Sequence, residues 1–250
     1  MQTGLVMILA GLVAVSARAG EVFVAAAASL SDVMKAVEPL YTRDHPGVKL
    51  TFVYGSTGML RTQLLKGAPC DVFIGADRWF GGTATNAEEV VKADSIRIVA
   101  ANTLVAVAGK GSSPTGDTLA AWLEGARKIG IGNPASVPAG RYAKKLLESA
   151  RLWEINSPKV VQGSNVREVL LWLRQGVVDV GFIYRSDLVA AKGDGLKTLA
   201  SYAAPGGMAI ELAGGVTKDA KNPAGAQAFL ECLGSPEAVR ALKAFGFVVK

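Results

Sequence analysis

Two stretches of the sequence place a serine hydroxyl where a strand-like apolar run gives way to a helical pattern. They are AAAASLSDV, residues 25–33, with Ser29 at the change, and FVYGSTGML, residues 52–60, with Ser56 there. A serine at a helix start either caps its own helix or offers its hydroxyl to a ligand, and capping is the more common role. SLSD also matches a capping box, in which Asp32 bonds back to the start of the helix.

Two further stretches leave backbone amides uncovered at a helix start. In SVPAGRYAKKLL, Pro138 suits the first helical position and the amide of Ala139 follows it. In GSNVREVLLWL, Asn165 is a natural N-cap and the amide of Val166 comes next. A first helical turn has about four amides without intrahelical partners, and the helix dipole places about half a positive charge there. Four such starts that met at one point would bind a small dianion without Lys or Arg in contact.

The elements that must position these groups alternate along the chain. Strand-like runs, several bounded by Gly or Pro, occupy residues 21–28, 48–55, 70–76, 103–109, 128–133, 157–163 and 178–184. Helical periodicity appears between many of them, at residues 30–41, 59–65, 142–147 and 169–173. This alternation predicts an α/β fold with mainly parallel sheets, in which binding sites lie beyond the carboxyl ends of the strands.

The composition narrows the classes of function. The chain has 250 residues, half of them apolar, which is enough for a large core. Its net charge is +6, but Lys and Arg are spread along the helices, which disfavours a nucleic-acid interface. The single histidine, His45, lies in the turn-like RDHPGV, so neither acyl-transfer catalysis nor a zinc site is indicated. Cys70 and Cys232 form either a disulfide or two free thiols.

The first residues are typical of an export signal. An apolar run from Leu5 to Val15 precedes Ala17, Arg18 and Ala19, which match a cleavage site after Ala19. No basic side chain precedes the run. About 11 apolar residues are too few for a membrane-spanning helix, which needs about 20. We therefore expect a signal peptide at residues 1–19 and a periplasmic protein.

Nearly the whole mature chain resembles the periplasmic molybdate-binding proteins of ABC transporters. The resemblance is carried by AAASLSDVM, GSTGMLRTQLLKGAPCDVFIGAD, LVAVAGKG, VPAGRYAKKLL, NVREVLLWLRQGVVDVGFIYRSD and AFLECLGSPEAVRALKAFGF. Carried over position by position, it implies that the oxyanion is bound by the hydroxyls and amides of Ser29 and Ser56, the amides of Ala139 and Val166, and the hydroxyl of Tyr184. Cys70 and Gly75 depart from the family pattern, and the segment after Asp77 matches it poorly.

The resemblance also implies an architecture, a type II periplasmic binding protein with two α/β lobes and a ligand cleft between them. Residues 20–98 with 209–250 would form the first lobe and residues 99–208 the second, with crossings near Ile98 and Ala209. Ser29 and Ser56 would then face Ala139, Val166 and Tyr184 across the cleft, and closure would complete the site.

The implied function is to capture molybdate or tungstate and deliver it to the membrane permease of an ABC transporter. The resemblance implies a monomer without a cofactor, catalytic role, nucleic-acid partner or direct metal ligand. A binding protein for another small oxyanion such as sulfate, or for another small solute, is the alternative. A regulator's effector domain is disfavoured by the export signal and by the lack of a helix-turn-helix segment.

Overall fold

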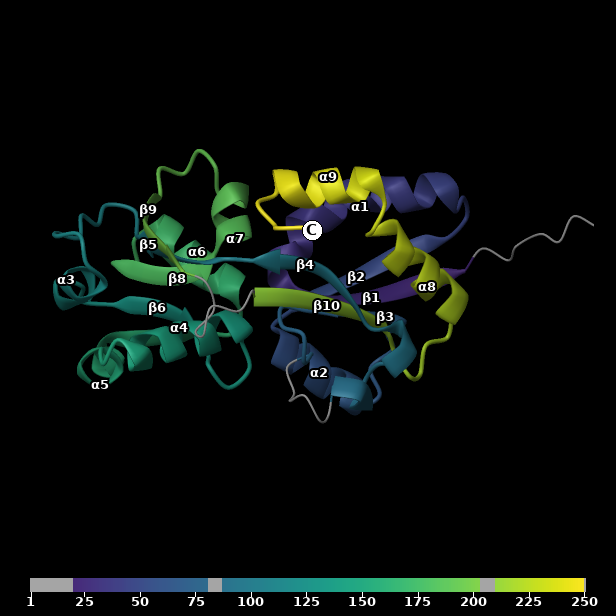
Figure 1. Cartoon of the computed structure of the whole chain (residues 1–250), viewed down its shortest axis with the longest axis horizontal. Helices are drawn as coiled ribbons and strands as arrows, with labels where there is room; N and C mark the ends of the chain where they lie inside the picture. The colour runs from purple at the N-terminus through teal and green to yellow at the C-terminus, as the bar shows by residue number, and fades with distance from the viewer. Residues whose placement is uncertain (1–19, 81–86, 203–209, 250) are drawn as a thin grey trace, which may run out of the picture.

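A computed structural model describes residues 20–80, 87–202 and 210–249. The expected signal peptide at residues 1–19 and the expected second crossing near Ala209 lie outside these residues. Two five-stranded sheets, each with helices against it, lie end to end along the long axis of the molecule (Figure 1). The predicted α/β class with two lobes is confirmed, and each lobe is named here by its sheet.

The first lobe surrounds a sheet of order β2-β1-β3-β10-β4. Its strands are β1 (Glu21–Ala27), β2 (Lys49–Gly55), β3 (Val72–Gly75), β4 (Arg97–Asn102) and β10 (Ile210–Val216). Its helices are η1 (Ala28–Leu30), α1 (Ser31–Asp44), α2 (Thr57–Leu65), η2 (Ala87–Glu89), η3 (Ala93–Ser95), α8 (Pro223–Cys232) and α9 (Pro236–Ala244). In Figure 1, α1 and α9 lie above the sheet and α2 lies below it.

The second lobe surrounds a sheet of order β7-β6-β8-β5-β9. Its strands are β5 (Leu104–Ala108), β6 (Ile129–Gly132), β7 (Val160–Gly163), β8 (Val180–Tyr184) and β9 (Lys197–Tyr202). Its helices are α3 (Leu119–Glu124), α4 (Pro138–Ser149), α5 (Trp153–Asn156), η4 (Ser157–Lys159), α6 (Val166–Gln175) and α7 (Arg185–Ala190). β4 in one sheet and β5 in the other are separated by Thr103 alone, so the expected crossing at Ile98 falls inside β4.

Both sheets are mixed, which corrects the expectation of mainly parallel sheets. β1 is parallel to β2 and β3, and β6 is parallel to β7 and β8. In contrast, β10 is antiparallel to β3 and β4, and β5 is antiparallel to β8 and β9. The strands that the sequence reading missed, β4, β9 and β10, all take part in antiparallel pairs.

Close packing shapes the core of each lobe. In the first lobe, the Tyr41 ring of α1 meets the Phe229 ring of α8 edge to face, with centroids 5.5 Å apart. In the second, a Cβ at Gly140 would lie 1.8 Å from the carbonyl oxygen of Gly132, so only glycine lets α4 approach β6 this closely.

The cysteines are both free, Cys70 buried and Cys232 half-buried, so the disulfide alternative is wrong.

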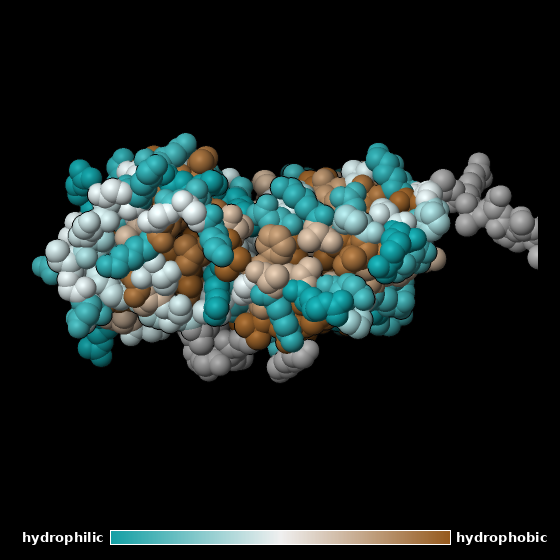
Figure 2. All heavy atoms as spheres, turned by 90° about the horizontal axis from the view of Figure 1, so that it is seen from above, coloured by the Kyte–Doolittle hydropathy of each residue, from teal (hydrophilic) through white to brown (hydrophobic). Residues whose placement is uncertain are grey.

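Polar residues spread over the face of both lobes that Figure 2 shows, with smaller apolar areas between them. Among the residues that the structure describes, no helix is long and apolar enough to span a membrane.

Candidate functional site

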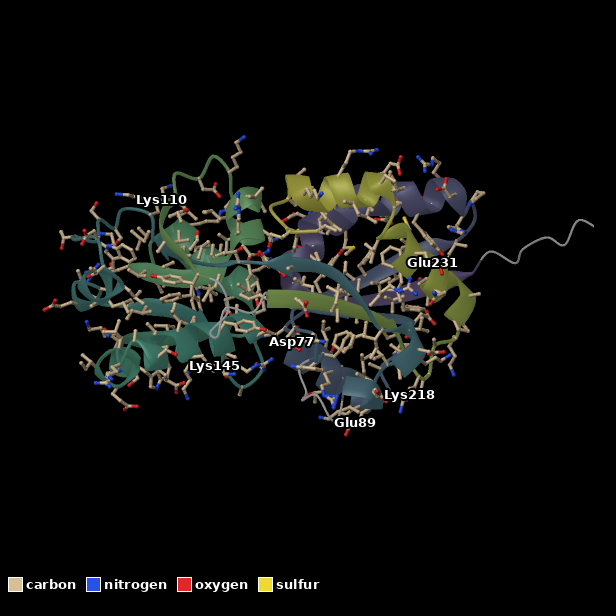
Figure 3. All side chains as sticks on the ribbon, viewed as in Figure 1. Asp77, Glu89, Lys110, Lys145, Lys218 and Glu231 are labelled. Atoms are coloured by element: carbon tan, nitrogen blue, oxygen red, sulfur yellow. The ribbon has the colours of Figure 1, made fainter. Side chains whose placement is uncertain are left out.

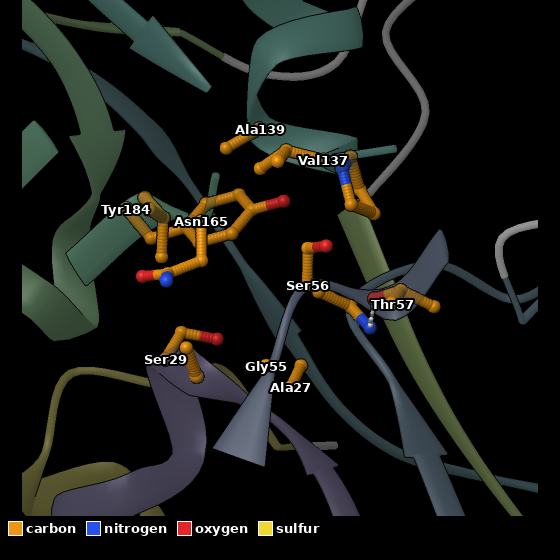
Figure 4. Close-up of a pocket in the computed structure, with 13 residues that line it drawn as sticks. Ala27, Ser29, Gly55, Ser56, Thr57, Val137, Ala139, Asn165 and Tyr184 are labelled. Atoms are coloured by element: carbon orange, nitrogen blue, oxygen red, sulfur yellow. Dashed lines mark hydrogen bonds between the residues drawn. The ribbon is translucent and has the colours of Figure 1, made fainter. Parts of the chain in front are cut away.

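One pocket lies where the two lobes meet, and all five predicted ligand residues line it (Figure 4). The first lobe contributes the ends of β1 and β2 with the helix starts that follow them, and the second contributes the starts of α4 and α6 and the end of β8. Its lining residues are Ala27, Ala28, Ser29, Gly55, Ser56, Thr57, Ala76, Val137, Pro138, Ala139, Asn165, Val166 and Tyr184. The pocket is small, with about 220 Å³ of empty space including the part that opens to solvent.

Three hydroxyl groups face this pocket and make no hydrogen bond to protein. They belong to Ser29, Ser56 and Tyr184, which are 2%, 4% and 1% exposed. Figure 4 shows the three side chains around the same space. A buried hydroxyl without a partner costs about 1–3 kcal/mol, so three of them in one pocket indicate a place for a ligand with several acceptors.

The capping role that competes with ligand binding fails for both serines. Ser56 is the N-cap of α2, but its side chain makes no capping hydrogen bond. Ser29 lies within η1, and α1 begins only at Ser31, without a side-chain cap. The expected capping box therefore does not form, because the Asp32 carboxylate is bonded to Arg167 of the second lobe instead.

The two side-chain-poor helix starts have the predicted form. Pro138 occupies the first turn of α4, and its N-cap, Val137, supplies no side-chain cap to the amides that follow. Asn165 caps α6 by accepting from the amides of Arg167 at 2.9 Å and Glu168 at 3.1 Å. These two bonds leave the amide of Val166 outside the cap.

Thr57 is a lining residue that the sequence reading did not single out. Its Oγ1 accepts from the amide of Ala76 at 2.9 Å, which ties the start of α2 to the end of β3. Thr57 is fully buried, and its bond is the dashed line in Figure 4. Thr57 therefore shapes the pocket rather than offering its hydroxyl to it.

Charged residues surround the pocket but do not line it. Arg141 of α4 donates to Asp77 of the first lobe at 2.8 Å, and Figure 3 shows Asp77 where the lobes meet. Arg167 of α6 bonds to Asp32 at 2.6 Å, and its Nε lies 2.7 Å from Asp187 in an ion pair without hydrogen-bond alignment. Arg141 and Arg167 are therefore both matched by carboxylates.

The pKa values of these groups follow from burial and charge. Complete burial raises the pKa of Asp187 to about 6, although Arg167 acts in the opposite direction. Burial works to raise the pKa of Asp32 as well, but Arg167 and Lys35 outweigh it and lower the value. Burial also raises the pKa of the Tyr184 hydroxyl well above its usual value, which keeps it protonated and able to donate.

The positions of Arg141 and Arg167 in the sequence already indicate that both form ion pairs. Arg167 lies in the first turn of α6, and Arg141 lies close to the start of α4, where the helix dipole disfavours positive charge. A cation at such a position needs a carboxylate from elsewhere in the fold. The type of residue at each helix start therefore predicts an ion pair, but the sequence does not say with which aspartate.

Acceptor groups for a cation are scarce at this site. Over the described ranges, no group of three or more His, Cys, Asp or Glu residues could hold a metal ion. The pocket presents hydroxyls and helix N-termini, which suit the oxygens of a small anion. His45 lies at the C-terminal end of α1 rather than in the pocket.

Two α/β lobes with mixed sheets, and between them a small pocket with hydroxyls and helix starts in its lining, define the class of type II periplasmic solute-binding proteins. The chain belongs to the bacterial extracellular solute-binding protein family, whose model matches residues 22–248.

Three comparisons place the chain among relatives of that class. It is 32% identical over 237 residues to the molybdate-binding protein ModA of Escherichia coli, an alignment that covers 92% of this chain and 90% of the relative. It is 28% identical to ModA of Haemophilus influenzae, with 98% and 96% covered. The periplasmic molybdate-binding protein of Azotobacter vinelandii has the same fold, with a TM-score of 0.78 at 22% identity over 92% of this chain and 99% of that one.

Proposed function

We propose that this protein binds molybdate or tungstate in the pocket between its lobes and delivers the ion to the membrane permease of an ABC transporter. The observation that carries the proposal is the meeting of three buried, unpartnered hydroxyls with the starts of α4 and α6. We propose the hydroxyls and amides of Ser29 and Ser56, the amides of Ala139 and Val166, and the Tyr184 hydroxyl as the ligand groups.

A pocket of donors favours a fully deprotonated ion. Hydrogen phosphate carries a proton that needs an acceptor, and an unpaired buried donor costs about 1–3 kcal/mol. Asp32 is the nearest carboxylate to the Ser29 helix start in sequence, and it is engaged by Arg167 and Lys35. Phosphate is therefore expected to bind weakly.

Sulfate has the same charge as molybdate, so size must separate them. Sulfur–oxygen bonds are shorter than molybdenum–oxygen bonds, and a smaller ion would stretch several hydrogen bonds at once between rigid helix starts. Molybdate and tungstate are nearly equal in size, so little discrimination between them is expected. The names of the relatives agree with this choice of ligand. Another small oxyanion or solute is the second candidate.

We also propose the cellular setting that the sequence predicts. The chain is exported through a signal peptide at residues 1–19, acts as a periplasmic monomer, and has no catalytic role. The sequence places the lobes at residues 20–98 with 209–250 and at residues 99–208. Because β4 belongs to the first sheet and β5 to the second, we move the first boundary from Ile98 to Thr103.

Thermal unfolding of the purified protein in separate molybdate, tungstate, sulfate and phosphate solutions tests the proposed ligand. At 100 times the dissociation constant, a ligand stabilises the fold by about 2.7 kcal/mol, which raises the Tm of a protein of this size by roughly 5 to 11 °C. We expect molybdate and tungstate to raise the Tm far more than sulfate or phosphate at equal millimolar concentration. An equal shift with sulfate, or no shift with any ion, would contradict the proposal.

A further inference from the structure

The guanidinium of Arg167 lies just outside the pocket and contacts three separate segments. Its Nη1 donates to Asp32 Oδ2 at 2.6 Å, and its Nη2 donates to the carbonyl oxygen of Ser29 at 3.3 Å. Its Nε lies 2.7 Å from Asp187 Oδ1. The side chain is 22% exposed, and Arg167 is not among the residues that line the pocket.

Each of these contacts leads to a proposed ligand group. Ser29 itself carries one of the unpartnered hydroxyls. Asp187 is completely buried, and its Oδ2 accepts from the backbone amide of Tyr184 at 3.0 Å, which fixes the end of β8 that carries the phenol. Arg167 directly follows Val166 at the start of α6. One side chain therefore joins the segments of Ser29, Val166 and Tyr184.

The Arg167 contacts also cross between the lobes. Asp32 and Ser29 belong to the first lobe, whereas Arg167 and Asp187 belong to the second. By contrast, Arg174, on the same helix as Arg167, pairs with Asp194 at 2.8 Å entirely within the second lobe. The bond between Arg167 and Asp32 therefore exists only while the lobes are together.

We propose that Arg167 is a positioning residue for the oxyanion site, and that its bond to Asp32 holds the lobes closed over the bound ion and slows its release. This inference rests on the proposed function. The carboxylates of Asp32 and Asp187 balance the guanidinium charge, so Arg167 acts through the segments that it joins rather than by attracting the ion. Loss of the bond is expected to raise the dissociation rate constant and leave the association rate constant nearly unchanged.

The decisive variant is Asp32→Asn, which weakens the contact between lobes and leaves the buried pair of Arg167 and Asp187 in place. Stopped-flow measurement of molybdate release is expected to show a rate constant roughly 3- to 30-fold above that of the unmodified protein, between the values for an exposed ion pair and a charged hydrogen bond. The Tm without ligand is expected to fall by no more than the loss of one partly exposed ion pair costs. A purely structural role of Asp32 would instead lower the Tm and leave the release rate unchanged. Asp32→Glu is expected to restore slow release in part.

Two matched controls isolate the contact. Asp194→Asn breaks the Arg174 pair within the second lobe, and Lys35→Met removes the exposed lysine that also contacts Asp32 at 3.3 Å. Both are expected to release molybdate at the unmodified rate. If Asp32→Asn releases no faster than these controls, the positioning role is overturned while the proposed function stands. If the unmodified protein binds no molybdate, the proposed function fails, and this inference fails with it.

Discussion

At the scale of single residues, the site depends on serine hydroxyls that do not cap the helix at whose start they lie. Serines at helix starts usually cap, and Ser235 does so in α9, where it accepts from the amide of Ala238 at 3.2 Å. Ser56 occupies the same position in α2 without making such a bond. The two serines therefore differ in what their hydroxyls do, and this difference is measurable.

Replacing Ser56 with Ala is expected to weaken molybdate binding and leave the ligand-free fold as stable as before. The lost bond to a charged ligand is worth about 1.5 to 3 kcal/mol, so the affinity measured by calorimetry is expected to fall roughly 10- to 150-fold. Ser235→Ala is the matched control: it is expected to lower stability by about 1 kcal/mol without changing affinity. A lower Tm and unchanged affinity for Ser56→Ala would assign this serine to capping.

The buried phenol leads to an expectation about pH. Burial, and then the nearby Tyr142 and Asp77, raise the pKa of Tyr184 well above its usual value near 10. The folded protein therefore keeps a proton that the unfolded chain loses, and the stability contributed by this group declines only above about pH 10. Molybdate affinity is expected to stay constant from about pH 7 to about pH 9, because the hydroxyl remains a donor.

Calorimetric titrations across that range measure this expectation. Tyr184→Phe is expected to lower the affinity at every pH and leave the profile flat. A steady loss of affinity between pH 7 and 9 in the unmodified protein would show that the phenol ionises there, against the expectation.

At the scale of elements, the lobes approach through backbone as well as through charge. The amide of Gly58, in the first turn of α2, donates to the carbonyl oxygen of Ser136 in the turn before α4 at 2.9 Å. A Cβ at Gly58 would lie 2.8 Å from that oxygen and 2.9 Å from the Cα of Ser136. Only glycine therefore allows this contact between α2 and the second lobe.

Replacing Gly58 with Ala is expected to hinder closure without harming the helix. Alanine in a helix is favoured over glycine by up to about 1 kcal/mol, so the ligand-free Tm is expected to hold or rise. Crowding against backbone costs about 1–3 kcal/mol in the closed form, a loss of roughly 5- to 150-fold in affinity. Gly125→Ala, at a position where the nearest atom is 3.9 Å away, is the control and is expected to bind normally. Normal binding by Gly58→Ala would contradict a role for this contact.

The sequence predicts those elements whose pattern is local. Apolar runs predict β1, β2 and β8, and helical periodicity predicts α1, α4 and α6. All six elements begin within a few residues of their expected positions. β10 was missed because IELAGGV contains two glycines, which weaken a strand pattern, and β9 was missed because its residues are half-exposed or exposed. The antiparallel pairs of β10 with β3 and β4, and of β5 with β8 and β9, join strands that are far apart in the chain, which no local pattern reports.

The site was predictable in its parts but not in its contacts. The four helix starts were visible as sequence, and the resemblance supplied Tyr184. The role of Asp32 was mistaken, because a capping box four residues long is a local pattern, whereas Arg167 is 135 positions away in the chain. The hydrogen bond that Asp32 makes instead, with Arg167, forms only where the two lobes meet.

At the scale of the whole molecule, the pocket belongs to neither lobe alone. The first lobe supplies Ser29 and Ser56, and the second supplies Ala139, Val166 and Tyr184. Opening would separate these groups and expose the hydroxyls to water, so that a ligand enters an incomplete site and closure completes it. The ion must therefore contact both lobes at once.

A crystal structure of the molybdate complex, with a molybdenum anomalous difference map, tests this requirement most directly. We expect one strong peak in the pocket, with no Lys or Arg in contact. The ion oxygens are expected within hydrogen-bond distance of the Ser29, Ser56 and Tyr184 hydroxyls and of the Ala139 and Val166 amides. A peak bound by one lobe only, a peak held by Arg141 or Arg167, or an empty pocket in crystals grown with saturating molybdate would contradict it.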